Sequence, residues 1–185
     1  SGLGDLLPQV SAGLLHSVGG DGKSHPSAPS NGRDPVGVLT SIDLKARRVR
    51  QTPVPMRDAH AAVGLGDGRV LCMPQQGERC VVVDAAHNVM HVLQAPPKYH
   101  FFGHALVRPA GQSTIVLTLK RVDFADVTDH GLLSIHDYAT LRHIQSVTSG
   151  GLNPHEITPI PGSDEVCAVH YGHISKKDAV RVRNV

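Results

Sequence analysis

Three histidines recur at corresponding points along the chain, and this recurrence constrains the fold more than any other feature. They are His60, His104 and His155, separated by 44 and 51 residues. Each opens a unit in which a short apolar run follows and a glycine turn comes seven or eight residues later, at Gly68, Gly111 and Gly162. A second marker keeps the same order, because an aspartate ends an apolar run 17 to 20 residues before each histidine: Asp43, Asp84 and Asp137. Two markers in one register indicate an internal repeat.

The length of the repeat predicts its architecture. Spacings of 44 and 51 residues are close to the roughly 40–50 residues of a four-stranded propeller blade. The chain consists of short apolar or alternating runs between turn residues, which is typical of strands, and no segment has a helical period. We therefore expect an all-β, β-propeller-like domain over residues 1–185, an array of four-stranded antiparallel blades with about four blades or an incomplete ring. The expected blades are 36–54, 58–93, 100–147 and 153–185, after a flexible loop at 19–35.

Composition agrees with a turn-rich β-protein and argues against several partners. Apolar residues make up 40% of the chain and charged residues 18%, with 19 glycines and 13 prolines. A net charge of +2, with no tryptophan, argues against a nucleic-acid partner. No apolar run approaches the roughly 18 residues of a membrane span. The first residues show no secretory signal, so we expect either a cytosolic protein or the mature part of an exported one.

The three cysteines cannot all pair within one chain. They are Cys72, Cys80 and Cys167, and we expect them to be buried and reduced. Cys72 and Cys80 flank a turn, so they could also face each other across a hairpin.

The thirteen histidines are the main chemical signal. On successive innermost strands, His60, His104 and His155 would project towards the propeller axis at one level, where a ring of imidazoles could bind copper, iron or zinc. His170 and His173 end an expected inner hairpin and could join this set. The alternative is structural: each histidine hydrogen-bonds the backbone of a neighbouring blade.

Glu156 is the candidate catalytic residue. It follows His155 directly and could act as a general base beside a bound metal or ligand. Asn153-Pro-His-Glu also resembles repeats of lactonase-type propellers, which would imply a hydrolase. The alternative is a glutamate that forms a salt bridge to the next blade.

A family resemblance rests on three segments in fixed order. Phe102-Gly-His-Ala, Gly131-Leu-Leu-Ser-Ile-His-Asp and Asn153-Pro-His-Glu-Ile resemble the bacterial propeller family catalogued as domain of unknown function 1513. The resemblance covers roughly residues 36–174. It implies an exported, periplasmic protein in a setting of iron uptake or haem-type redox chemistry, and it implies no reaction.

These observations favour a non-catalytic propeller scaffold that binds a transition metal through axial histidines, in an iron- or copper-related periplasmic system. Two alternatives stay open: a metal-dependent hydrolase or lactonase, and a structural subunit that completes a larger propeller. Because about three complete blades are too few for a ring, we expect a homo-oligomer or a second polypeptide to complete the assembly.

Overall fold

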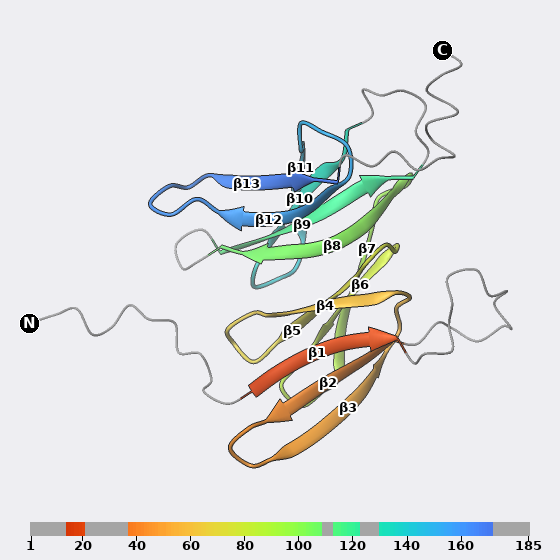
Figure 1. The fold of residues 1–185 in the computed structure, drawn as a ribbon, viewed down its shortest axis with the longest axis vertical. Coiled ribbons are helices and arrows are strands. Elements are labelled where there is room, and N and C mark those ends of the chain that lie inside the picture. The colour runs from red at the N-terminus through yellow and green to blue at the C-terminus, as the bar shows by residue number, and fades with distance from the viewer. Residues whose placement is uncertain (1–13, 21–36, 109–112, 123–129, 172–185) are drawn as a thin grey trace, which may run out of the picture.

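The computed structural model describes residues 14–20, 37–108, 113–122 and 130–171, giving only the backbone of 14–20. All regular elements in these residues are strands, arranged in four antiparallel sheets (Figure 1). The first two sheets are β1 (Leu14–Gly20), β2 (Gly37–Asp43) and β3 (Arg48–Val54), then β4 (Ala59–Gly64), β5 (Val70–Pro74), β6 (Arg79–Val83) and β7 (Val89–Gln94). The other two are β8 (Tyr99–Val107), β9 (Thr114–Arg121), β10 (Leu132–Asp137) and β11 (His143–Thr148), then β12 (Pro154–Pro159) and β13 (Val166–His170). The described part of the chain contains no helix that could cross a membrane.

Each sheet is a simple meander in which consecutive strands pair. The predicted all-β class is confirmed, and the second and third sheets have the predicted four strands. Over the ranges that the structure describes, the first sheet has three strands and the fourth has two, and the sheets do not close into a ring. Residues 172–185 of the predicted last blade lie outside these ranges. Of the predicted loop at 19–35, Gly19 and Gly20 belong to β1, and residues 21–36 are not described.

The aspartate marker is a turn device. Asp43, Asp84 and Asp137 each accept a hydrogen bond from a backbone N–H three or four residues on, at 2.7–2.8 Å, and so close the turns after β2, β6 and β10. The shared turn makes β2 equivalent to β6 and β10, and β1 equivalent to β5 and β9. Within the described residues the first sheet therefore has no counterpart of β4, β8 and β12.

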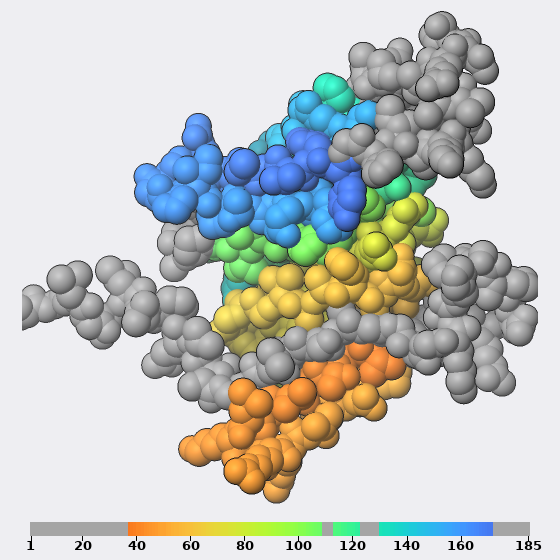
Figure 2. Space-filling model, in the orientation of Figure 1, coloured from red at the N-terminus to blue at the C-terminus, as the bar shows by residue number. Residues whose placement is uncertain are grey.

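Apolar side chains fill the spaces between successive sheets, which follow one another in chain order (Figure 2). The largest cluster joins the second and third sheets and includes the fully buried Phe101 and Leu117. Cys72 packs towards the first sheet, whereas Cys80 packs towards the third, so they lie on opposite faces of one sheet. They do not face each other across the hairpin. Both are buried as predicted, but Cys167 is exposed.

Burial falls from the centre of each four-stranded sheet to its outer edge. The central strands β5 and β6 are almost wholly buried, and both carry near-continuous apolar runs. The outer strands β7 and β11 are almost wholly exposed. On the other side, the first strands β4, β8 and β12 lie next to one another. These three strands carry the recurring histidines.

Candidate metal centre

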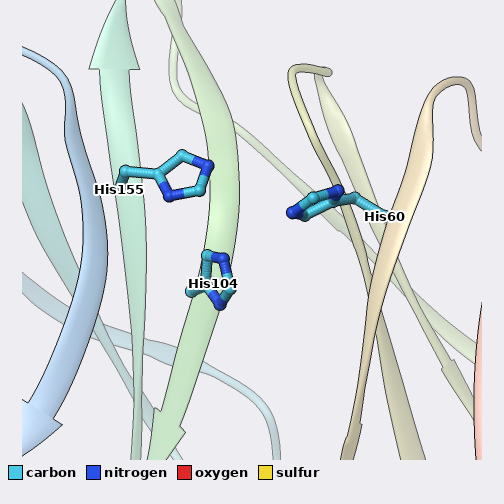
Figure 3. Close-up of side chains that lie close together, drawn as sticks. All are labelled: His60, His104 and His155. Atoms are coloured by element: carbon cyan, nitrogen blue, oxygen red, sulfur yellow. The ribbon is translucent and has the colours of Figure 1, made fainter. Parts of the chain in front are cut away.

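The side chains of His60, His104 and His155 converge from β4, β8 and β12 (Figure 3). One ring nitrogen of each lies within 4.8 Å of those of the other two. The ring centroids are 4.7 Å apart for His104 and His155, 5.4 Å for His60 and His104, and 5.9 Å for His60 and His155. His60 is exposed and the other two are half-buried, so the cluster is open to solvent.

Each of these histidines lies at an irregularity in its strand pairing. The register between β4 and β5 shifts across His60, and the register between β12 and β13 shifts across His155. The pairing of β8 with β9 is interrupted between Phe101 and Ala105, which brackets His104. A bulge inserts an unpaired residue and redirects its side chain. Three bulges at equivalent positions therefore turn the imidazoles towards one another.

The residues before the histidines explain the bulges. Asp58 and Asn153, two residues before their histidines, have φ values of 52° and 51°, and Gly103, directly before His104, has a φ of 91°. Asp, Asn and Gly are the residues that adopt this left-handed backbone most readily. The repeated sequence before each histidine is thus a backbone device, which sequence reasoning did not identify.

Gly103 and Thr118 support the cluster through the backbone of β8. A Cβ atom on Gly103 would lie 2.8 Å from Nε2 of His155, so only glycine leaves room for that ring. The fully buried hydroxyl of Thr118 donates towards the carbonyls of Phe102 at 2.6 Å and His104 at 3.0 Å. Thr118 thereby fixes the irregular segment of β8. Gly103 belongs to the Phe102-Gly-His-Ala motif, whereas Thr118 belongs to no motif in the sequence.

Two aromatic side chains form a wall beside His155. The His155 ring centroid lies 4.6 Å from that of Tyr171 and 5.0 Å from that of Phe102, both in edge-on geometry. The ammonium of Lys120 lies over the ring of Phe102, 4.9 Å from its centroid. Burial, followed by the positive charges that His104 and His60 can carry, lowers the pKa of His155 below 6.5. The lowered pKa favours the neutral form of His155, which is the form that binds metals.

Glu156 contacts a histidine of the cluster. One carboxylate oxygen lies 3.3 Å from Nδ1 of His104, and the other accepts the backbone N–H of Ile157 at 3.0 Å. When Nδ1 of His104 carries the proton, its Nε2 presents a lone pair. Such a carboxylate beside a histidine is typical of metal sites, where it sets the orientation and tautomer of the ligand.

The other predicted site residues lie elsewhere or outside the described ranges. His170, at the end of β13, packs its ring on Gly151 rather than on the cluster. His173 lies outside the described residues. Two histidines that were not predicted as site residues also lie apart from the cluster: His100 faces Glu78, with 3.7 Å between Nε2 and the carboxylate, and His87 contacts the hydroxyl of Thr52 at 2.6 Å.

A further histidine is wholly engaged by the protein. His136, on β10, is 5% exposed; its Nδ1 donates to the carbonyl of Leu141 at 3.1 Å and its Nε2 accepts from the Ser134 hydroxyl at 2.9 Å. Because both nitrogens are satisfied and Ser134 is also buried, this serine–histidine pair has a structural role.

The cluster has the dimensions of a slightly open three-histidine site. Imidazole nitrogens bind Zn²⁺ at about 2.0–2.1 Å, which places tetrahedral neighbours roughly 3.4 Å apart. Nitrogens within 4.8 Å of one another can reach this spacing by small ring rotations. Three protein nitrogens also leave one coordination position for water or a ligand.

Comparison with known proteins gives a family but no function. A family model described as "Protein of unknown function (DUF1513)" matches residues 52–183. No curated protein and no solved structure shows a significant match. The matched range contains all three histidines and begins within β3.

Proposed function

Because the chain belongs to the DUF1513 family, whose description names no activity, we propose from its geometry that it is a scaffold that binds one transition-metal ion through His60, His104 and His155. One observation carries the proposal: three bulges on three neighbouring strands bring three imidazoles together. A purely structural role would require each ring to bond the backbone of a neighbouring sheet. No such hydrogen bond to His60 or His155 is present in the described residues.

The donor set indicates which metals fit. Neutral imidazole suits zinc, copper, iron and nickel, whereas calcium and magnesium prefer oxygen ligands. Divalent affinities rise from iron through nickel to a maximum at copper, so we expect Cu²⁺ to bind more tightly than Zn²⁺, Ni²⁺ or Fe²⁺. Glu156 acts in this proposal as a positioning residue for His104, in place of the general base that its sequence suggested.

The scaffold itself is proposed to be an arc of propeller blades. Its support is the side-by-side placement of β4, β8 and β12 and the repeated turn after β2, β6 and β10. In such an arc the first strands face the axis, and a site built on them lies at the axial mouth. A second copy or another polypeptide would complete the ring, and an exported, periplasmic location is the predicted setting.

Native mass spectrometry and metal titration test this proposal together. The protein loaded with Zn²⁺ or Cu²⁺ and then dialysed should keep close to one ion per chain. His60→Ala, His104→Ala and His155→Ala should each weaken binding at least a hundredfold, more than the 10–100-fold cost of losing a residue that only supports a ligand.

His91→Ala is the matched control, because His91 is an exposed histidine on β7 outside the cluster. Its metal affinity should equal that of the wild type. A protein that binds no ion, or one whose binding survives all three substitutions, would leave the structural-subunit alternative instead.

A metal-dependent hydrolase is the second candidate. It is favoured by the open coordination position that three protein ligands leave, since a metal-bound water in such a position can become a nucleophile near pH 7. Turnover of a panel of lactones and esters by the metal-loaded protein, lost in His155→Ala, would establish it. A loaded protein without turnover would leave the scaffold function.

A further inference from the structure

A second candidate site lies apart from the histidine cluster, in a pocket of about 360 Å³. Three separate segments form its walls: residues 55–57 before β4, the turn between β5 and β6 together with the first residue of β6, and the start of β8. None of the cluster histidines lines it. The lining residues are Pro55, Met56, Arg57, Gln76, Gly77, Glu78, Arg79 and His100.

The walls of this pocket are tied to one another, so the pocket is largely preformed. Gly77 exchanges two backbone hydrogen bonds with Phe101, of 3.2 and 2.8 Å, which fix the turn between β5 and β6 against β8. The side-chain oxygen of Gln76 accepts from Lys120 at 3.0 Å. Met56 is 1% exposed and anchors the remaining wall in the core. A preformed pocket costs little ordering when a ligand binds.

The pocket carries an excess of unused positive charge. Arg57 and Arg79 both line it, and neither guanidinium has an ion pair or hydrogen bond among the described residues. The one lining carboxylate, Glu78, is directed to His100 at 3.7 Å and is mostly exposed. Guanidinium groups recognise carboxylates and phosphates through paired, charge-assisted hydrogen bonds.

We propose that this pocket binds a small organic anion, whose carboxylate or phosphate group is held by Arg57 and Arg79. The volume is near the lower end of the range for small-molecule sites, roughly 300–1,000 Å³, which favours a ligand of metabolite size. Glu78 limits the net positive charge of the site and so favours ligands of low charge. The proposal does not depend on metal binding, because the two sites share no residue.

Two simple probes test the proposal: succinate for the carboxylate class and inorganic phosphate for the phosphate class. Each is titrated into the full chain at low ionic strength while amide chemical shifts are recorded. We expect saturable shifts at Gln76, Gly77 and His100 for at least one probe, and the tighter probe identifies the class. Arg57→Gln and Arg79→Gln should each weaken its binding about tenfold, whereas Glu78→Gln should tighten it severalfold.

Arg142→Gln is the matched control, because Arg142 is an exposed arginine in the turn between β10 and β11 and does not line the pocket. It should leave the dissociation constant unchanged. The proposal is overturned if neither probe saturates, or if Arg142→Gln weakens binding as much as the pocket substitutions do. His155→Ala should bind the probe normally, which separates a failure of this site from a failure of the metal site.

Discussion

His155 and His136 are chemically the same side chain, and burial lowers the pKa of both, yet the fold uses them in opposite ways. Both nitrogens of His136 are hydrogen-bonded within the third sheet. The nitrogens of His155 make no hydrogen bond to the described residues, and its ring lies beside those of His60 and His104. A histidine that is available to bind a metal is therefore recognised by the hydrogen bonds that its nitrogens lack, rather than by its burial or its pKa.

The largest expected effect that sharpens this comparison comes from Gly103→Ala. The new Cβ would meet the His155 ring at 2.8 Å, and the backbone at a φ of 91° disfavours alanine. We expect metal binding to be lost and the free energy of unfolding to fall by about 2 kcal/mol. Metal titration and urea denaturation measure the two effects.

Gly150→Ala separates the two causes, because Gly150 has a similar φ of 77° but nothing within 4 Å of its Cβ position. It should cost about 1 kcal/mol of stability from backbone strain alone and leave metal affinity unchanged. Equal loss of metal in both variants would show that Gly103 does not act through His155.

The next effect is on stability alone. His136→Leu removes both hydrogen bonds and leaves the Ser134 hydroxyl and the Leu141 carbonyl buried without them. We expect it to lower the free energy of unfolding by about 1–3 kcal/mol, measured by urea denaturation, and to leave the metal affinity unchanged. His155→Ala should instead weaken metal binding and leave the free energy of unfolding unchanged. If both variants lost stability equally, the distinction between the two histidines would fail.

Glu156→Gln tests the support of His104. An amide oxygen still accepts a hydrogen bond but carries no charge, so the Nδ1–H tautomer of His104 is favoured less. Because Glu156 is half-exposed, we expect about a tenfold loss of metal affinity, the lower end of the usual range for such partners. Isothermal titration measures it, with the exposed Glu165→Gln as control. A hundredfold loss would instead indicate that Glu156 binds the ion directly.

The smallest effect is a pH dependence of stability. Burial, and then the charges of His143 and His91, lower the folded-state pKa of His136 below 6.5, although the Leu141 carbonyl opposes this. The unfolded chain therefore takes up the proton first as pH falls, and the contribution of His136 is complete above pH 6.5 and lost below it. The urea concentration at the unfolding midpoint should therefore decrease when the pH is lowered from 7.5 to 5.5.

His100 and His155 also have lowered pKa values and add to this slope in the same direction. The slope should accordingly shrink, but not vanish, in His136→Leu. An unchanged slope would show that His136 is protonated equally in the folded and unfolded states.

The sequence predicted the strands and the meeting of the three histidines, because both follow from periodicity. The strand ends at Asp43, Asp84 and Asp137 could be predicted because an aspartate that closes a turn lies at the end of the strand before it. Equal placement on successive strands then predicted that His60 and His155 would approach each other. The family was also predicted from ordered motifs, and the matching family model confirms it.

What the sequence did not predict depends on register and on contacts between distant strands. Single-residue bulges lie at His60 and His155, and the pairing of β8 is interrupted between Phe101 and Ala105, so the alternation of side chains along a strand did not predict these irregularities. The same sensitivity explains the cysteines: Cys72 pairs with Val81, which puts Cys80 on the opposite face of the sheet. The support that Thr118 gives to β8 appears only once β8 and β9 are paired.

The placement of the three candidate ligands on three different sheets has a mechanical consequence. Without an ion, neighbouring sheets are held together largely by apolar side chains. A bound ion would be a reversible cross-link that closes chain loops of 44 and 51 residues, each comparable to a disulfide loop worth about 4 kcal/mol in chain entropy. The metal concentration would then control how easily neighbouring sheets separate, and so how readily a protease or a strand of a partner reaches the space between them.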